Sequence, residues 1–145
     1  MANTINLKII TPDRVVYNNP VSQITAVAND GELTILPGHE PLVTTLAIDV
    51  LRFKTTGQEE ETAAVIGGIL NVNKDEIEIL SDVAELDVEI DEARAHQARA
   101  KAEAEKTQKT DKLEVYMTEL ALGRAMARLK AAEMAKMRRR TRGQQ

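Results

Sequence analysis

The sequence contains no cysteine and no tryptophan, and only one phenylalanine and two tyrosines occur among its 145 residues. Without cysteine the chain has no disulfide framework and no thiolate metal site. So few aromatic rings argue against a surface on which nucleic-acid bases stack. The longest apolar run, residues 63–70, is far shorter than the roughly 20 residues that cross a bilayer. We therefore expect no nucleic-acid partner and no direct membrane insertion.

Groups typical of catalysis are equally scarce. The two histidines, His39 and His96, lie far apart in the sequence. No glycine-rich loop is followed by the Lys-Ser/Thr pair that holds a nucleotide phosphate. The carboxylates are scattered along the chain, as expected for solvated surface charge. We expect no catalytic residue, no metal ligand and no catalytic cofactor, which favours a binding or regulatory protein.

The charge is divided unequally along the chain. Residues 1–86 carry 13 acids and 5 bases, a net charge of −8, whereas residues 87–145 carry 10 acids and 14 bases, a net charge of +4. Two halves of opposite sign suggest two domains with different partners. We therefore expect one domain over residues 1–86 and a second over residues 87–145.

The first half has the pattern of short strands separated by turns. All four prolines and five of the seven glycines lie before residue 69. Apolar residues alternate with others in several short runs, as in half-buried strands. The residues expected to share a face are Ile5, Leu7 and Ile9; Ile24, Ala26 and Ala28; Leu33 and Ile35; Ile48 and Val50; and Ile77 and Ile79. Strands at this spacing predict an antiparallel β-sandwich, with a bulge or tight turn at Gly67-Gly68.

The second half is typical of helices. Residues 87–122 contain neither glycine nor proline and are rich in Ala, Glu, Lys and Arg, which are strong helix formers. Residues 107–111 interrupt the pattern, and Asp111 is suited to cap a second helix, with Glu114 three residues later. We predict helices over about residues 90–106 and 112–137, joined as an antiparallel hairpin. The predicted fold is therefore α+β, a sandwich followed by this hairpin.

The predicted hairpin has little apolar surface with which to hold itself in place. On the second helix one apolar stripe is expected, formed by Leu113, Tyr116, Met117, Leu120 and Ala127. The first helix offers mostly alanine, which packs closely but buries little area. A weakly held element is a candidate moving part.

Three segments of the first half identify a family. They are residues 10–13 (ITPD), residues 31–42 (GELTILPGHEPL) and residues 67–72 (GGILNV). Their order and spacing, together with the helical second half, resemble the epsilon subunit of bacterial F-type ATP synthases over residues 3–136. The resemblance implies a non-catalytic rotor subunit on the cytoplasmic face of the bacterial cell membrane. Its β domain would contact the gamma subunit and the c-ring. Its hairpin would either fold on the β domain or extend toward the alpha and beta catalytic subunits and inhibit ATP hydrolysis.

One edge of the β domain is a candidate docking surface for the rotor. Gly31, Pro37, Gly38 and Pro41 restrict the backbone of a strand and its following loop. Glu32, His39 and Glu40 would project from this stiff segment. They are either ordinary turn residues or docking residues for the rotor, and His39 could also respond to pH.

A further resemblance concerns ATP as an allosteric ligand, which would not be a substrate. Residues 90–95 (IDEARA) match a motif, Ile/Leu-Asp-x-x-Arg-Ala, that is linked to ATP binding in the epsilon subunits of some bacilli. The match implies a site built from Glu85, Ile90, Asp91, Arg94, Ala95, Lys101, Arg124 and Arg128. Lys101 stands where that pattern has an arginine, and a lysine cannot grip phosphate with a two-pronged fork.

The spacing of Arg124 and Arg128 places both on one helix face, and none of their neighbours on that helix is acidic. Their anion must therefore come from outside the helix. It could be ATP, a carboxylate of the first helix such as Glu103, or a partner subunit. Arg94 could form a plain salt bridge with Asp91 one turn earlier.

The basic tail, residues 136–142, also leaves several readings open. It could be frayed, could touch nucleic acid or anionic lipid, or could bind an acidic groove on the catalytic subunits, which is the reading we favour. A free nucleotide-sensing module remains the alternative to a rotor subunit.

Overall fold

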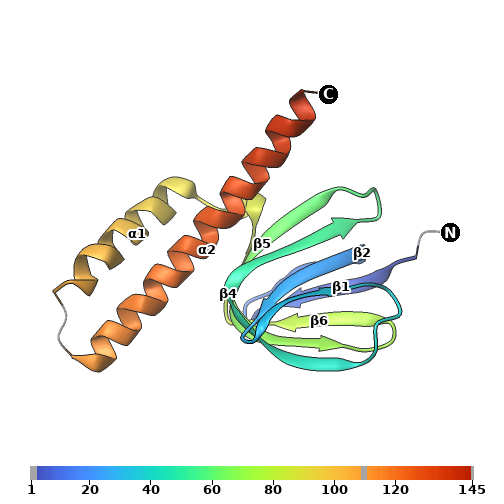
Figure 1. The fold of residues 1–145 in the computed structure, drawn as a ribbon, viewed down its shortest axis with the longest axis horizontal. Coiled ribbons are helices and arrows are strands. Elements are labelled where there is room, and N and C mark those ends of the chain that lie inside the picture. The colour runs from blue at the N-terminus through green and yellow to red at the C-terminus, as the bar shows by residue number, and fades with distance from the viewer. Residues whose placement is uncertain (1–2, 109–110, 145) are drawn as a thin grey trace.

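The computed structural model describes residues 3–108 and 111–144, and it places a β-sandwich before a pair of helices (Figure 1). The strands are β1 (Ile5–Ile10), β2 (Val15–Ala28), β3 (Gly31–Ile35), β4 (Leu42–Thr55), β5 (Glu60–Val72), β6 (Glu76–Leu80) and β7 (Ala84–Leu86). A single 3-10 turn, η1 (Asp87–Glu89), leads to α1 (Glu92–Lys106) and α2 (Lys112–Gly143). The predicted α+β fold is confirmed.

The strands form one strongly curved sheet in the order β1-β6-β5-β4-β2-β3, with β7 paired to β5. A further pairing of β1 with β2 folds the sheet back on itself into two layers. The long strands β2, β4 and β5, of 14, 14 and 13 residues, bend from one layer into the other. The pair β1–β6 is parallel, with Leu7 opposite Ile77, and this pair departs from the otherwise antiparallel pattern.

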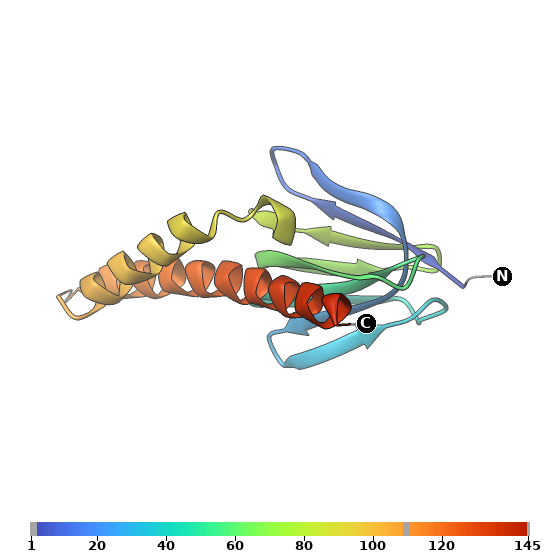
Figure 2. The ribbon, with the colours of Figure 1, turned by 90° about the horizontal axis from the view of Figure 1, so that it is seen from above.

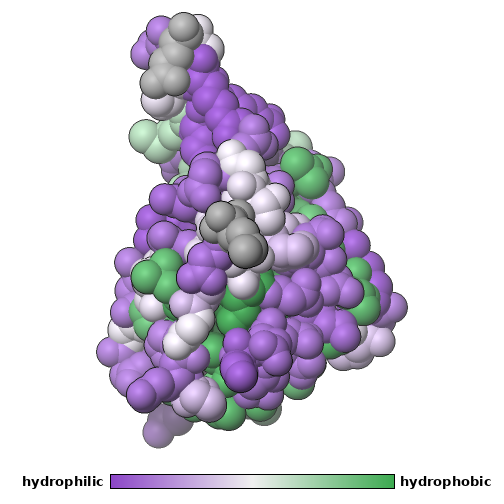
Figure 3. All heavy atoms as spheres, turned by 90° about the vertical axis from the view of Figure 1, so that its right-hand side faces the viewer, coloured by the Kyte–Doolittle hydropathy of each residue, from purple (hydrophilic) through white to green (hydrophobic). Residues whose placement is uncertain are grey.

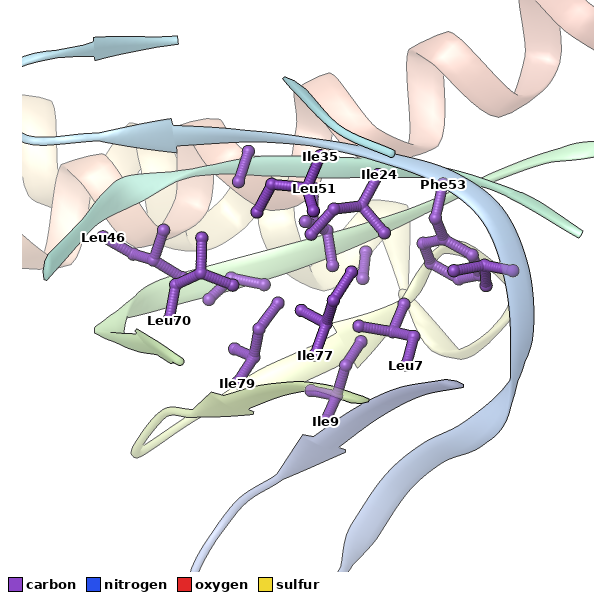
Figure 4. Packing of buried hydrophobic residues seen from close by; sticks show 14 of the residues in the cluster. Leu7, Ile9, Ile24, Ile35, Leu46, Leu51, Phe53, Leu70, Ile77 and Ile79 are labelled. Atoms are coloured by element: carbon purple, nitrogen blue, oxygen red, sulfur yellow. The ribbon is translucent and has the colours of Figure 1, made fainter. Parts of the chain in front are cut away.

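The core lies between the two layers and consists of the alternating apolar residues of the strands (Figure 4). Leu7, Ile9, Ile24, Ile77 and Ile79 are fully buried there, so most of the predicted strand faces are confirmed. Ile48 and Val50 are the exception. They face away from this core and pack under α2 instead.

Gly67 and Gly68 lie inside β5, where the neighbouring strand changes from β6 to β7. Their φ angles are +68° and +125°, which a residue with a side chain rarely adopts. A Cβ on Gly68 would lie 2.1 Å from the carbonyl oxygen of Leu80. The pair therefore lets the chain kink and lets a second backbone approach closely, in agreement with the predicted irregularity.

The two helices run side by side in opposite directions, and α2 continues past the sandwich (Figure 2). The side chain of Asp111 accepts a hydrogen bond from the backbone N–H of Leu113 at 2.8 Å, so the predicted N-cap is confirmed. The helix α2 ends at Gly143 rather than near residue 137. The interpretation of the basic tail as frayed is therefore wrong for its described residues. In the space-filling view this projecting end of α2 is largely hydrophilic (Figure 3).

The buried face of α2 differs from the predicted apolar stripe. Leu113, Tyr116 and Met117 are 68%, 57% and 55% exposed. The face that packs against other elements is formed mainly by small residues, and these are Thr118, Ala125, Ala127, Ala131, Ala132 and Ala135. Ala127 and Ala131 lie on Val50 of β4 and Ala64 of β5. The predicted stripe is confirmed at Ala127 and wrong at its bulky exposed residues, because small side chains let the helix approach the sheet closely and bulky ones would hold it away.

Candidate functional site

The motif at residues 90–95 lies where the sandwich passes into α1. The carboxylate of Asp91 caps the helix, since its Oδ1 accepts a hydrogen bond from the backbone N–H of Arg94 at 3.1 Å. Ala95 is buried on the inner side of α1. Ile90 packs beside the cluster that joins α2 to the sheet. The motif therefore has a structural role of its own, and it leaves the Arg94 side chain exposed to solvent.

A charged cleft of about 400 Å³ opens beside this motif, between β7, the start of α1 and the middle of α2. Its lining residues are Glu85, Glu89, Asp91, Arg94, Ala95, Ala98 and Arg128. Five of the eight residues that the sequence assigns to an ATP site meet here. Among the described residues Arg94 forms no ion pair, although Asp91 lies one turn earlier. The simple Asp91–Arg94 salt bridge is therefore absent.

Arg128 already has an anion in this cleft. Its Nε donates to both carboxylate oxygens of Glu85 at 3.1 Å, and its Nη2 donates to Oε1 at 2.9 Å. Both side chains are only partly exposed. The anion does come from outside the helix, as the sequence indicated, but it comes from β7 rather than from α1. Glu103, the carboxylate considered on α1, pairs with Arg99 instead.

Three residues of the implied site do not line the cleft. Ile90 packs toward the sheet, and Lys101 is largely exposed and lies 3.9 Å from Glu105. Arg124 lies one turn before Arg128 on α2. Its Nε is buried without a hydrogen-bond partner, and it forms no ion pair among the residues the structure describes. Arg124 thus keeps unused hydrogen-bonding capacity next to the cleft.

The sequence did not single out Glu89, which lines the cleft, or Arg14, which pairs with Glu89. Arg14 donates to Glu89 at 2.9 Å, and the two residues are separated by 75 positions in the chain. The hydrogen bond from Arg14 lowers the pKa of Glu89, and the backbone N–H of Leu86 acts in the same direction. The same carboxylate raises the pKa of the Arg14 guanidinium. No local pattern could have revealed this pair, because it depends on the path of the chain.

Of the predicted rotor-facing residues, His39 and Glu40 lie in the connection from β3 to β4, whereas Glu32 lies at the start of β3. His39 donates its backbone N–H to the carbonyl of Leu36, and its Nδ1 lies 2.6 Å from the carbonyl oxygen of Glu40. Glu32 lies 3.2 Å from Arg52. The glycine at position 38 has a φ of +88°, so the loop turns where the sequence indicated. The segment is a hydrogen-bonded turn, and its role in docking stays a prediction.

Neither a metal centre nor a membrane-crossing helix is found in the described part of the chain. Among residues 3–108 and 111–144, no group of three His, Cys, Asp or Glu side chains could hold a metal ion. None of the described helices combines the length and the apolarity that a bilayer span requires.

These features define a class of protein: a small β-sandwich with a C-terminal helical hairpin laid on its outer face and a charged cleft at the junction. Residues 4–87 match the family model described as "ATP synthase, Delta/Epsilon chain, beta-sandwich domain". Residues 89–133 match the model for the "long alpha-helix domain" of the same chain. The chain belongs to the ATP synthase delta/epsilon chain family.

Relatives and solved structures agree with this assignment. The ATP synthase epsilon chain of Desulforamulus reducens is 41% identical over 133 residues, which cover 92% of this chain and all of the relative. That of Moorella thermoacetica is 43% identical over 129 residues, 89% of this chain and 96% of the relative. A chain in the Euglena gracilis mitochondrial ATP synthase (OSCP/F1/c-ring) superposes with a TM-score of 0.77 at 30% identity, covering 90% of this chain and 81% of that one. The predicted resemblance to the epsilon subunit is confirmed, and family membership supports a non-catalytic role.

Proposed function

We propose that this chain works in the central stalk of a proton-translocating ATP synthase, where it couples the catalytic head to the c-ring. Its sandwich would contact the gamma subunit and the c-ring through the turn that carries His39 and Glu40. Its relatives are named ATP synthase epsilon chains, and a structural neighbour belongs to a mitochondrial ATP synthase assembly that contains F1 and the c-ring. The chain would then lie on the cytoplasmic face of the cell membrane, held there by its partners.

The helical arm would act as a movable inhibitor of ATP hydrolysis. The observation that carries this proposal is the alanine interface between α2 and the sheet. Each fully buried Val or Leu contributes about 1.5–3 kcal/mol, whereas an alanine methyl contributes a fraction of that. On α1 the buried residues are Ala95 and Ala102. Such an arm can leave the sheet at modest cost and extend toward the alpha and beta subunits.

ATP would bind in the charged cleft as a regulatory ligand. Arg94 and Arg124 have no ion pair among the described residues, and Arg128 is held by Glu85. A phosphate could take the place of the Glu85 carboxylate on Arg128 and also reach Arg94 and Arg124, with Lys101 assisting. Asp91 would lie on the adenine side, away from the phosphates. Because the cleft is lined by β7, α1 and α2 together, a ligand there would hold the arm folded.

Calorimetric titration of ATP into the isolated chain tests this ligand. We expect saturable binding, weakened at least about tenfold by Arg128→Ala or Arg124→Ala, since each loses a charge-assisted hydrogen bond. Arg99→Ala is the matched control, because Arg99 lies on α1 outside the cleft and pairs with Glu103. Absence of heat up to millimolar ATP, or binding that survives both substitutions, would contradict the site.

The charged cleft also favours the alternative of a free nucleotide-sensing module. Co-purification separates the two. A stalk subunit is recovered with gamma and the catalytic hexamer, whereas a free sensor is recovered alone and still binds nucleotide.

A further inference from the structure

The end of α2 is joined to the sandwich by a polar cluster, which we name the tail joint and define as Arg138, Asp87 and Thr62. Nη2 of Arg138 donates to Oδ2 of Asp87 at 2.6 Å and to Oγ1 of Thr62 at 3.3 Å. The Thr62 hydroxyl lies 3.1 Å from Oδ2 of Asp87 and 3.3 Å from the carbonyl oxygen of Ala131. The cluster therefore connects β5, η1 and two successive turns of α2.

The ion pair of the tail joint is largely buried, so each of its charges depends on the other for compensation. The Asp87 side chain is 9% exposed, and Thr62 is fully buried. A carboxylate removed from water to this degree is costly unless a cation and hydrogen bonds compensate it. If α2 leaves the sheet, Asp87 loses Arg138 and keeps only the hydroxyl of Thr62 among the partners found here. The folded arm therefore depends on both residues of the pair, because removal of either leaves the other largely buried without its partner.

The surroundings of the joint are acidic on the sandwich and basic on the helix. Glu60 and Glu61 begin β5, Glu59 directly precedes it, and Arg142 lies 3.4 Å from Glu59. Burial raises the pKa of Glu61, and the nearby Asp87 raises it further, whereas Arg138 lowers it. The basic tail of this chain thus has an acidic counterpart within the chain itself.

Asp87 lies at the base of the helical arm. It is in η1, which directly follows the last strand and leads into the two helices. Arg138 lies on the last turns of α2 and beyond residue 133, where the match to the helical family model ends. One ion pair therefore ties the far end of the arm back to its origin.

We propose that the Asp87–Arg138 pair, with Thr62, is a latch that holds the helical arm on the sandwich and must break before the arm extends. This inference rests on the proposed mobility of the arm. It adds a more deeply buried pair at the far end of α2 to an interface made of small side chains and of the pairs Arg128–Glu85 and Lys130–Asp49. Arg142–Glu59 is exposed and contributes much less, since surface pairs are weak and screened by salt.

The test measures arm opening in the isolated full-length chain. Because the chain has no cysteine, Asn19→Cys on the sandwich and Ala121→Cys on α2, both at exposed positions, can carry a pair of spin labels. We expect Arg138→Met and Asp87→Asn each to raise the population with the long inter-label distance at least about tenfold, since each leaves a buried charge unpaired. The double substitution is expected to open the arm no further than either single one, as for coupled partners.

Two further variants make the result decisive. Arg139→Met is the matched control: Arg139 is exposed on the same turn, outside the joint, and its loss is expected to leave the distance distribution unchanged. Ala127→Arg disrupts the alanine interface on Val50 and Ala64 at a residue outside the joint, and it is expected to open the arm. If Ala127→Arg opens the arm and the latch variants do not, the latch is overturned while arm mobility stands. If no variant opens it, mobility itself is wrong and the latch fails with it.

Discussion

At the scale of single residues, two carboxylates show how position decides the role of a common side chain. Asp91 caps α1 through the backbone N–H of Arg94, so it stabilises the start of the helix that carries the motif at residues 90–95. Glu85 instead forms a bidentate ion pair with Arg128 across the cleft. An anion that bound Arg128 as proposed would therefore have to replace this carboxylate.

Gly68 gives a prediction at this scale. A Cβ there would lie 2.1 Å from the Leu80 carbonyl oxygen at a φ of +125°. We expect Gly68→Ala to lower the free energy of unfolding by about 3 kcal/mol, because steric overlap adds to backbone strain. The matched control is Gly31→Ala, which also has a positive φ but no atom within 4 Å of its Cβ. For Gly31→Ala we expect the free energy of unfolding to fall by about 1–2 kcal/mol. Equal losses in urea unfolding of the two variants would argue against the close approach.

Glu61 gives a prediction about pH. Its pKa is raised, first by burial and then by Asp87, so folding disfavours the charged form of this carboxyl group. A raised pKa means that stability is fully present below the unfolded pKa and is lost as pH rises through the folded one. We expect Glu61→Gln to stabilise the chain at pH 7 and this gain to vanish below about pH 4, near the unfolded pKa of Glu. Thermal unfolding across this range measures it, with Glu60→Gln as the control. A gain that persists unchanged at low pH would contradict the assignment.

At the scale of elements, the chain contains two separate apolar clusters. The larger lies between the layers of the sandwich and involves no helical residue. The smaller joins Val50 and Ala64 to Ala127 and Ala131 under α2. Because the first cluster is formed without the helices, we expect the sandwich to fold without them.

Truncation after Leu86 tests this separation. We expect residues 1–86 to fold and to bind gamma, with a free energy of unfolding lower by about 2–3 kcal/mol, since Val50 is fully exposed on removal of α2. Circular dichroism and a gamma pull-down measure the two outcomes, with the full chain as the control. A truncated form that is unfolded, or folded but unable to bind gamma, would show that the helices are part of the same unit.

At the scale of the whole molecule, the basic end of α2 has two kinds of arginine. Arg138 and Arg142 pair with acids of the sandwich, whereas Arg139 and Arg140 are exposed. In the proposed function the first kind would hold the arm folded, and the second would be available to an acidic groove on a catalytic subunit once the arm extends. Replacing all four together would therefore mix opposite effects.

Separate substitutions in the assembled ATP synthase distinguish the effects of the two kinds of arginine. We expect Arg139→Ala with Arg140→Ala to raise ATP hydrolysis, because docking of the extended arm is weakened. Arg138→Met is expected to lower hydrolysis, because the folded arm is released. High salt is expected to imitate the first change, since exposed charges are screened beyond about 8–10 Å at physiological ionic strength. If both variants change hydrolysis in the same direction, the two kinds of arginine do not have separate roles.

Local patterns in the sequence were sufficient for much of this molecule. Alternation in residues 5–9 and 77–79 predicted buried strands, and Asp111 predicted the start of α2, because pleat and helix termini depend on neighbouring residues. The segments at residues 10–13, 31–42 and 67–72, with the helical second half, were sufficient to indicate the family. The match at residues 90–95 also indicated most of the residues that line the cleft.

Only the tertiary structure determined which residues each face of a helix contacts. Helical spacing placed Arg124 and Arg128 together, but only the chain path set Glu85, 43 positions away, against Arg128. The same path left Leu113, Tyr116 and Met117 exposed, and it placed alanines on the buried face in their stead. It also joined Arg138 to Asp87, which is 51 positions away. Periodicity states which residues share a side of a helix, whereas the choice of the buried side depends on the shape of the surface that the helix meets. That shape is created by residues distant in sequence, so no local pattern contains it.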